Sequence, residues 1–221
     1  MWDRKFEIIF TVFVTALIIG SVILISLNTM NDSSVSPQTV SKSTSGSSGL
    51  QLILRTSGSN ITQGKNISIS LEVFNPGFLT ASLSSNGTIW KTCHEEGFST
   101  GPCSFKPFGI LIAYGNYSTS QIKVASPLQF YAPGVYLCPL IPAVNQYVFN
   151  PHSSNARMYY NSVESTTGQD TASFNYQLNI SGYWTGNSES NAEFHTFSPG
   201  VYTIFGSDGW NQITVLHFLV K

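Results

Sequence analysis

Two stretches of strict two-residue alternation constrain this chain more than any other feature of its sequence. In NISISLEVF the apolar residues are Ile67, Ile69, Leu71 and Val73, and the residues between them are polar. ASFNYQLNI, residues 172–180, alternates in the same way. Successive side chains of a strand point to opposite faces, so period two over this length predicts half-buried β-strands.

Shorter apolar runs predict further strands, separated by clusters of Pro, Gly, Asn and Ser. These runs are LQLIL (50–54), GILIAY (109–114), QIKVA (121–125), GVYLC (134–138), QYVF (146–149), GVYTIF (200–205) and ITVLHFLV (213–220). No stretch beyond residue 27 keeps an uninterrupted apolar period of 3.6, so we expect little helix. Residues 50–221 are therefore predicted to form an all-β antiparallel sandwich, immunoglobulin-like or cupredoxin-like.

The N-terminal region predicts one transmembrane helix before this domain. Residues 8–27 carry no charge, and at 1.5 Å per residue they span about 30 Å, the thickness of a hydrocarbon core. Arg4 and Lys5 lie in residues 1–7, so the positive-inside rule places this end in the cytoplasm and the C-terminal domain outside the cell. A cleaved signal peptide is the competing interpretation, but no convincing small-residue cleavage site follows the span. A pilin-like subunit of a surface filament is a further alternative.

The segment before the domain and the overall charge of the chain indicate how the domain is attached and what it can bind. Residues 28–49 are rich in Ser, Thr and Gly and are expected to form a flexible tether. Lys and Arg number 10 against 11 Asp and Glu, so nothing in the balance favours a nucleic-acid partner. Charged residues make up only 10% of the chain, and the polar surface must be mostly hydroxyl and amide. The expected partners are the membrane and other envelope proteins or glycans.

N-glycosylation sequons agree with an exported glycoprotein. Six Asn-x-Ser/Thr triplets follow the predicted span, a modest excess over chance in a chain this rich in Ser and Thr. The first, at Asn31, lies in the tether. The expected glycosylation sites in the domain are Asn60, Asn66, Asn86, Asn116 and Asn179.

Copper is the sharpest chemical hypothesis for this chain. A blue-copper site needs His, then Cys at the end of a strand, then His and a weak axial Met. His94, Cys138, His152 and Met158 occur in that order. Thirteen residues separate Cys138 from His152, however, whereas cupredoxins hold both ligands on a short loop. We therefore expect no metal and keep copper as the alternative cofactor.

A disulfide is the simpler use of these cysteines outside the cytoplasm. Cys93, Cys103 and Cys138 allow three pairings and leave one thiol over. A bond between Cys93 and Cys103 would close a local loop. A bond between Cys103 and Cys138 would join two predicted strands and stabilise the fold by about 3–4 kcal/mol.

No catalytic motif stands out, so we expect a protein that is not an enzyme. Glu95 and Glu96 follow His94, but a zinc motif would need a second His where Phe98 stands. An extracellular hydrolase using these carboxylates is the rival hypothesis. Asp208 is expected to close a tight hairpin, and His217 is expected to be structural.

Aromatic residues near the C-terminus offer a second candidate surface. Trp184 and Trp210, with Tyr183, could form an exposed platform for glycans or a partner. Sandwich aromatics are more often buried.

Three stretches resemble a family of uncharacterised archaeal proteins that are membrane-anchored and extracytoplasmic. They are PLQFYAPGVYLCPLI (127–141), GYWTG (182–186) and FHTFSPGVYTIFGSDGWNQITVLHFLV (194–220). The family's ending is similar at Pro199–Thr203, Asp208, Trp210 and the His217–Phe218 pair, although Asn211 stands where the family often has Gly. The resemblance implies a Cys103–Cys138 disulfide with Cys93 as the free thiol. It implies no activity.

Together these patterns predict a single-pass membrane protein with an extracellular β-sandwich. Its expected role is a non-catalytic cell-surface component that binds or supports other envelope components.

Overall fold

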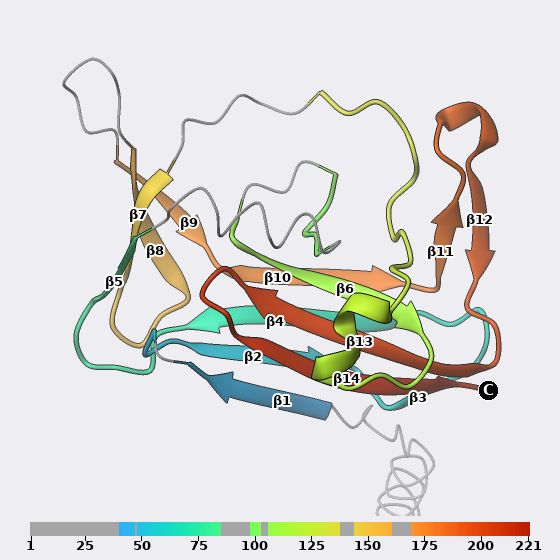
Figure 1. The fold of residues 1–221 in the computed structure, drawn as a ribbon, viewed down its shortest axis with the longest axis horizontal. Coiled ribbons are helices and arrows are strands. Elements are labelled where there is room, and N and C mark those ends of the chain that lie inside the picture. Colours follow the sequence, from blue (N-terminus) through green and yellow to red (C-terminus); the bar gives the residue numbers. More distant parts are fainter. Residues whose placement is uncertain (1–39, 47, 85–97, 103–105, 138–143, 161–168) are drawn as a thin grey trace, which may run out of the picture. The chain divides into compact units, whose positions relative to one another are not determined.

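The computed structural model describes residues 40–46, 48–84, 98–102, 106–137, 144–160 and 169–221. The chain divides into two compact units, Met1–Pro37 and Gln38–Lys221, and the described residues belong to the second. The described residues are all-β apart from two short 3-10 helices, η1 (Thr119–Val124) and η2 (Glu189–Asn191) (Figure 1). No helix in the described ranges is long and apolar enough to cross a membrane. The span expected at residues 8–27 lies outside those ranges.

Within the described ranges the strands form three four-stranded sheets and a separate hairpin (Figure 1). The first sheet runs in the order β1 (Val40–Ser45), β2 (Gln51–Thr56), β4 (Ile67–Phe74), β10 (Asn175–Ile180). The second runs in the order β3 (Asn60–Ile61), β14 (Ile213–Val220), β13 (Gly200–Asp208), β6 (Phe108–Tyr114). The third runs in the order β5 (Ala81–Ser84), β7 (Val144–Phe149), β8 (Asn155–Tyr160), β9 (Gln169–Ser173). The hairpin joins β11 (Gly182–Thr185) to β12 (Glu193–Thr196).

Strand pairing is antiparallel except at the short strand β3. Asn60 and Ile61 pair in parallel with Leu219 and Val220 of the last strand, β14. The chain thus leaves the first sheet after β2, pairs briefly with the second sheet, and returns to the first as β4.

The first and second sheets face each other across the main core. The apolar set of β4 that the alternation singled out is buried, as predicted, and packs against inward residues of β6, β13 and β14. Each fully buried Leu or Ile side chain here contributes about 1.5–3 kcal/mol to stability. The sheets approach closely at Gly206: a Cβ there would lie 2.5 Å from Leu71 Cδ1, so the Leu71 side chain would have to shift.

The second sheet is buried on both faces, which explains why its strands are apolar almost throughout. Leu111, Phe205 and Val215 point away from the main core and form a second cluster. Phe98 and Ile122, from the segments before β6 and in η1, cover this cluster. The outward side chains of β2, β4 and β10 in the first sheet are mostly polar.

The run ASFNYQLNI forms two strands instead of one. Its alternation is correct, but β9 pairs with β8 in the third sheet and β10 pairs with β4 in the first. The change of partner occurs at Phe174, whose N–H donates to Ser154 O (2.7 Å) and whose carbonyl accepts from Val73 N–H (2.9 Å). Trp210, at the turn between β13 and β14, contacts Phe174 together with Tyr147 and Phe149 of the third sheet.

The two Pro-Gly-Val-Tyr motifs share a local bond but differ in their surroundings. The hydroxyl of Tyr202 donates to Ser198 O (3.0 Å), and the hydroxyl of Tyr136 donates to Ala132 O. Tyr202 lies in β13, which has β6 and β14 on either side. Residues 134–137, predicted as a strand, pair with no neighbour in the described part of the chain.

Two further segments differ from the sequence-based expectation. QIKVA forms most of η1 rather than a strand. The Ser118 N–H donates to Gln121 Oε1 (2.9 Å) at the start of this helix. The helical turn also buries Ile122 and Ala125, which are three residues apart. Val124, which a strand would have placed beside Ile122, is 71% exposed. Strand β1 lies within the range 28–49 expected to be a tether, so residues 40–45 of that range are paired in a sheet.

Candidate binding surfaces

Of the four residues in the copper hypothesis, His152 and Met158 lie in the described ranges, and His94 and Cys138 do not. The His152 ring packs edge-on against Phe78 at an exposed turn, with ring centroids 4.7 Å apart. Met158 lies on β8 against the main core, and its sulfur accepts a hydrogen bond from Tyr160 (3.9 Å). The two side chains thus have different neighbours, and copper stays an untested alternative.

The cysteines and the carboxylates of the hydrolase hypothesis also lie outside the described residues. This applies to Cys93, Cys103, Cys138, Glu95 and Glu96, and to the sequon at Asn86. Within the described ranges, no three His, Cys, Asp or Glu side chains come together as a metal site would require.

Two residues expected to be structural have structural roles. Asp208 Oδ1 accepts the backbone N–H of Trp210 and of Gln212, both at 2.9 Å, and Oδ2 accepts Gln212 Nε2–H (2.7 Å). Burial raises the pKa of Asp208 to about 6, although these three donors act to lower it. His217 Nε2 lies 3.0 Å from Tyr117 O and holds the loop between β6 and η1 against β14.

The three aromatic residues proposed as one platform separate in the structure. Trp210 is packed among the rings described above, and Tyr183 packs against the main core next to Phe197. Trp184 lies on the opposite face of β11, in edge contact with Phe194 of β12 (centroids 5.3 Å apart), and Phe194 is 43% exposed.

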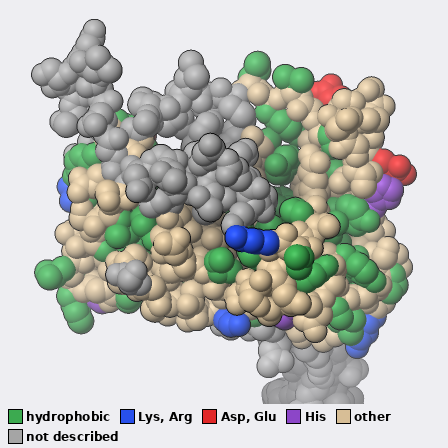
Figure 2. Space-filling model, in the orientation of Figure 1, with side chains coloured by type: hydrophobic (Ala, Val, Ile, Leu, Met, Phe, Trp, Pro, Cys, Tyr) green, Lys and Arg blue, Asp and Glu red, His purple; other side chains and the backbone are tan. Residues whose placement is uncertain are grey.

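The segment that is bonded to β11 carries further exposed apolar side chains. Trp184 N–H donates to Gln129 O (2.6 Å), which places residue 129 alongside β11. At the end of that segment Val135 and Leu137 are 88% and 97% exposed. Figure 2 shows several hydrophobic side chains (green) exposed on the face of the molecule that it draws. We call Val135, Tyr136, Leu137, Trp184 and Phe194 the aromatic surface.

The hairpin that carries this surface is closely packed and weakly charged. A Cβ on Gly182 would lie 2.0 Å from the carbonyl oxygen of His195, so β11 and β12 approach this closely only because residue 182 is glycine. Residues 126–137 and 182–200 contain no Lys or Arg, and their carboxylates are Glu189 and Glu193. Thr185 Oγ1 (2.9 Å) and the Glu193 carboxylate (3.7 Å) both lie near His195 Nε2 at the exposed side of the hairpin.

A second candidate surface lies on the outer face of the first sheet. There, an open groove of about 500 Å³ crosses β2, β4 and β10. It is lined by Arg55, Thr56, Ser57, Ser68, Ile69, Ser70, Gln177, Leu178 and Asn179. We call this the polar groove.

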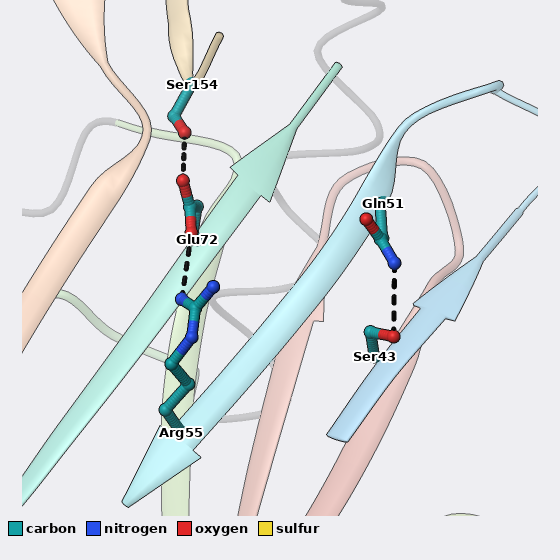
Figure 3. Close-up of polar contacts among 5 residues, drawn as sticks. All are labelled: Ser43, Gln51, Arg55, Glu72 and Ser154. Carbon is teal, nitrogen blue, oxygen red and sulfur yellow. Dashed lines mark hydrogen bonds and ion pairs between the residues drawn. The ribbon is translucent and has the colours of Figure 1, made fainter. Parts of the chain in front are cut away.

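The one cation of the groove is neutralised by a carboxylate beside it. Arg55 Nη1 lies 2.8 Å from Glu72 Oε2, and Ser154 donates to the other carboxylate oxygen (Figure 3). Burial alone would raise the pKa of Glu72, but the bonds from Ser154 and Arg55 outweigh it and hold the pKa below its usual value. The groove therefore presents hydroxyl and amide groups with little net charge.

The sequence showed the polar residues that line the groove, but it did not show that they lie next to one another. The polar residues that alternate with the apolar ones in β4 and β10 form its floor, and the register pairs Ser70 with Gln177 and Ser68 with Asn179. The sequence does not specify that these two strands are neighbours.

Comparison with known proteins adds no relative. No protein-family model matches the chain, and no curated protein matches its sequence.

Proposed function

We propose that this chain is a membrane-anchored, extracytoplasmic protein that binds another protein of the cell envelope and catalyses no reaction. The observation that carries the proposal is the aromatic surface, where Val135 and Leu137 are almost fully exposed on the segment whose residue 129 is bonded to β11, the strand that carries Trp184. Apolar side chains gathered on the surface of a folded domain mark contact sites for other molecules.

The location is inferred from the sequence. The uncharged segment 8–27 supports a membrane anchor, the two cations before it support a cytoplasmic N-terminus, and the sequons support export. The resemblance to archaeal surface proteins supports the same location.

Strand order supports the immunoglobulin-like alternative for the domain. β10, β4 and β2 correspond to strands E, B and A of an immunoglobulin sandwich, and β6, β13 and β14 correspond to C, F and G. Immunoglobulin-like domains also have a tyrosine corner near the start of strand F, and Tyr202 makes this bond near the start of β13. Ile204 stands two residues later, where antibody domains have a cysteine.

The chemistry of the aromatic surface favours a protein partner with a basic rim. Trp and Tyr dominate the energetics of protein interfaces, because they bury much area at little entropic cost. Glu189 and Glu193 supply the charges of the hairpin, so a matching partner would place Lys or Arg around an apolar pocket.

The proposal is tested by cross-linking the full-length chain on the surface of the cells that produce it. The recovered partner is quantified for the wild type, for Leu137→Ser and for Trp184→Ala. Both substitutions are expected to reduce recovery about tenfold, equivalent to about 1.4 kcal/mol of binding free energy. Leu137→Ser changes a side chain that is 97% exposed, so it leaves the fold intact.

Leu79→Ser is the matched control, because Leu79 is also a highly exposed leucine (82%) but lies on the turn between β4 and β5. It is expected to recover as much partner as the wild type. Equal recovery from the wild type and Leu137→Ser would show that the aromatic surface is not the binding site.

A further inference from the structure

The sequons of the described chain differ in where they lie. Asn60, Asn66, Asn116 and Asn179 are all exposed. Of these, Asn179 lines the polar groove, where its Oδ1 accepts a hydrogen bond from Ser68 (3.3 Å). Its Nδ2, the atom that carries an N-linked glycan, makes no hydrogen bond within the described ranges, whereas Asn60 Nδ2 donates to Ser59 (3.1 Å).

The groove has the chemistry of a sugar-binding surface. Ser70 and Gln177 lie side by side on its floor, and neither side chain is hydrogen-bonded to another residue in the part of the chain that the structure describes. Arg55 keeps N–H donors that Glu72 does not use, and the pair has little net charge. Sugar hydroxyls both donate and accept, so this set of donors and acceptors can pair with them.

The same groove is poorly built for a ligand that arrives from solution. It is open, about 500 Å³ in volume, and has no aromatic residue in its lining. Sites that hold free small molecules are enclosed and mostly apolar, because hydrogen bonds to a polar ligand replace bonds to water and gain little. A sugar attached to the chain pays no translational entropy on entering the groove, so weak hydrogen bonds are sufficient to hold it.

We propose that Asn179 is N-glycosylated and that the innermost sugars of this glycan lie in the polar groove. In the modification, Asn179 Nδ2 forms a bond to the anomeric carbon of a lipid-linked sugar phosphate. The bond from that carbon to the phosphate oxygen breaks, the lipid phosphate leaves, and the amide loses one proton. The cell's glycosyltransferase machinery supplies the donor and the catalyst. The proposal requires the domain to be exported but does not depend on the aromatic surface.

The first test is mass spectrometry of glycopeptides from the full-length chain, purified from the membranes of its own cells. The peptide that contains Asn179 is expected to carry a glycan and to lose it in a Ser181→Ala variant, which removes the sequon but keeps the bond between Ser68 and Asn179. An unmodified Asn179 in the wild-type protein overturns the proposal, whatever the state of the other sequons.

The second test asks whether the glycan lies in the groove. Gln177→Ala is introduced into the glycosylated protein and into the Ser181→Ala background, and thermal unfolding is followed for all four proteins. In the glycosylated protein the substitution is expected to lower Tm by about 2–4 °C, the shift for about 1 kcal/mol in a chain of this size. In the Ser181→Ala background the shift is expected to disappear, because the two changes act on one interaction.

Two controls separate contact from general effects of glycosylation. Asn116→Gln removes an exposed sequon outside the groove and is expected to leave the effect of Gln177→Ala unchanged. Asn175→Ala, on the same strand and face as Gln177 but outside the lining, is expected to shift Tm equally with and without Ser181. Equal shifts for Gln177→Ala in both backgrounds would show that the glycan does not occupy the groove.

Discussion

At the scale of single residues, the two Pro-Gly-Val-Tyr motifs provide a matched pair. Tyr202 is 1% exposed and its hydroxyl is bonded to Ser198 O, while Tyr136 makes the equivalent bond at 41% exposure. Tyr202→Phe removes the hydrogen bond of a tyrosine that is 1% exposed and is expected to cost about 1 kcal/mol. Tyr136→Phe is expected to cost almost nothing, because water can replace the lost hydroxyl. Urea unfolding of both variants measures the difference, and equal losses would contradict it.

Asp208 gives the domain a predictable dependence on pH. Burial raises its pKa to about 6 in the folded state, against 3.8 for the ordinary group. Between these values the folded chain binds more protons than the unfolded one. The stabilisation from protonation is therefore fully present below about pH 4 and is lost as the pH rises through 6.

The measurement compares the unfolding free energy of the wild type with that of Asp208→Asn from pH 4 to pH 7. The difference between the two proteins is expected to change by about 2 kcal/mol over this range, in the direction that favours the wild type at low pH. A difference that does not change with pH would mean that Asp208 titrates at its ordinary value.

At the scale of elements, the hairpin of β11 and β12 depends on one glycine. The Cβ of Gly182→Ala would collide with the backbone of His195, so β12 must move away and the Trp184–Phe194 contact is expected to break. Hydrogen exchange of the peptide that spans residues 182–197 is expected to become at least about tenfold faster, as local opening costs less free energy. Gly58→Ala is the control, because its Cβ would meet nothing closer than 3.7 Å. Unchanged exchange in Gly182→Ala would argue against this packing.

The elements also show how far the sequence alone could lead. Strict alternation located β4 and all its buried residues, because a strand with one polar face carries that signal in every residue. It failed at QIKVA, where Ser118 and Gln121 form a capping box that local periodicity does not record. It also failed at residues 134–137, since a strand requires a neighbour and pairing is decided by residues far away in the chain. The hairpin surface was missed for the same reason, although Trp184 itself was a candidate.

At the scale of the whole domain, the outer faces of the first and second sheets differ in how far other segments cover them. The outer face of the second sheet is partly covered by the segments around Phe98 and Ile122, which pack on Leu111, Phe205 and Val215. The outer face of the first sheet carries the polar groove, and the aromatic surface lies at the hairpin, on separate strands. Binding of a partner and glycosylation at Asn179 can therefore be tested independently, because Leu137→Ser and Ser181→Ala change different surfaces.

Trp210 packs at the junction between the third sheet and the rest of the domain, and this leads to the last prediction. Trp210 lies between Tyr147, Phe149 and Phe174, with ring centroids 5.7–6.2 Å away. Because Trp210 is only partly buried, Trp210→Ala is expected to cost about 3 kcal/mol, the lower end of the range for tryptophans in a core. Trp184→Ala is the matched control, expected to cost less than about 1 kcal/mol, since Trp184 packs on the hairpin surface. Calorimetry measures both losses. Because the junction couples the third sheet to the sandwich, Trp210→Ala is also expected to split a single unfolding transition into two. A single transition with an unchanged Tm would refute this coupling.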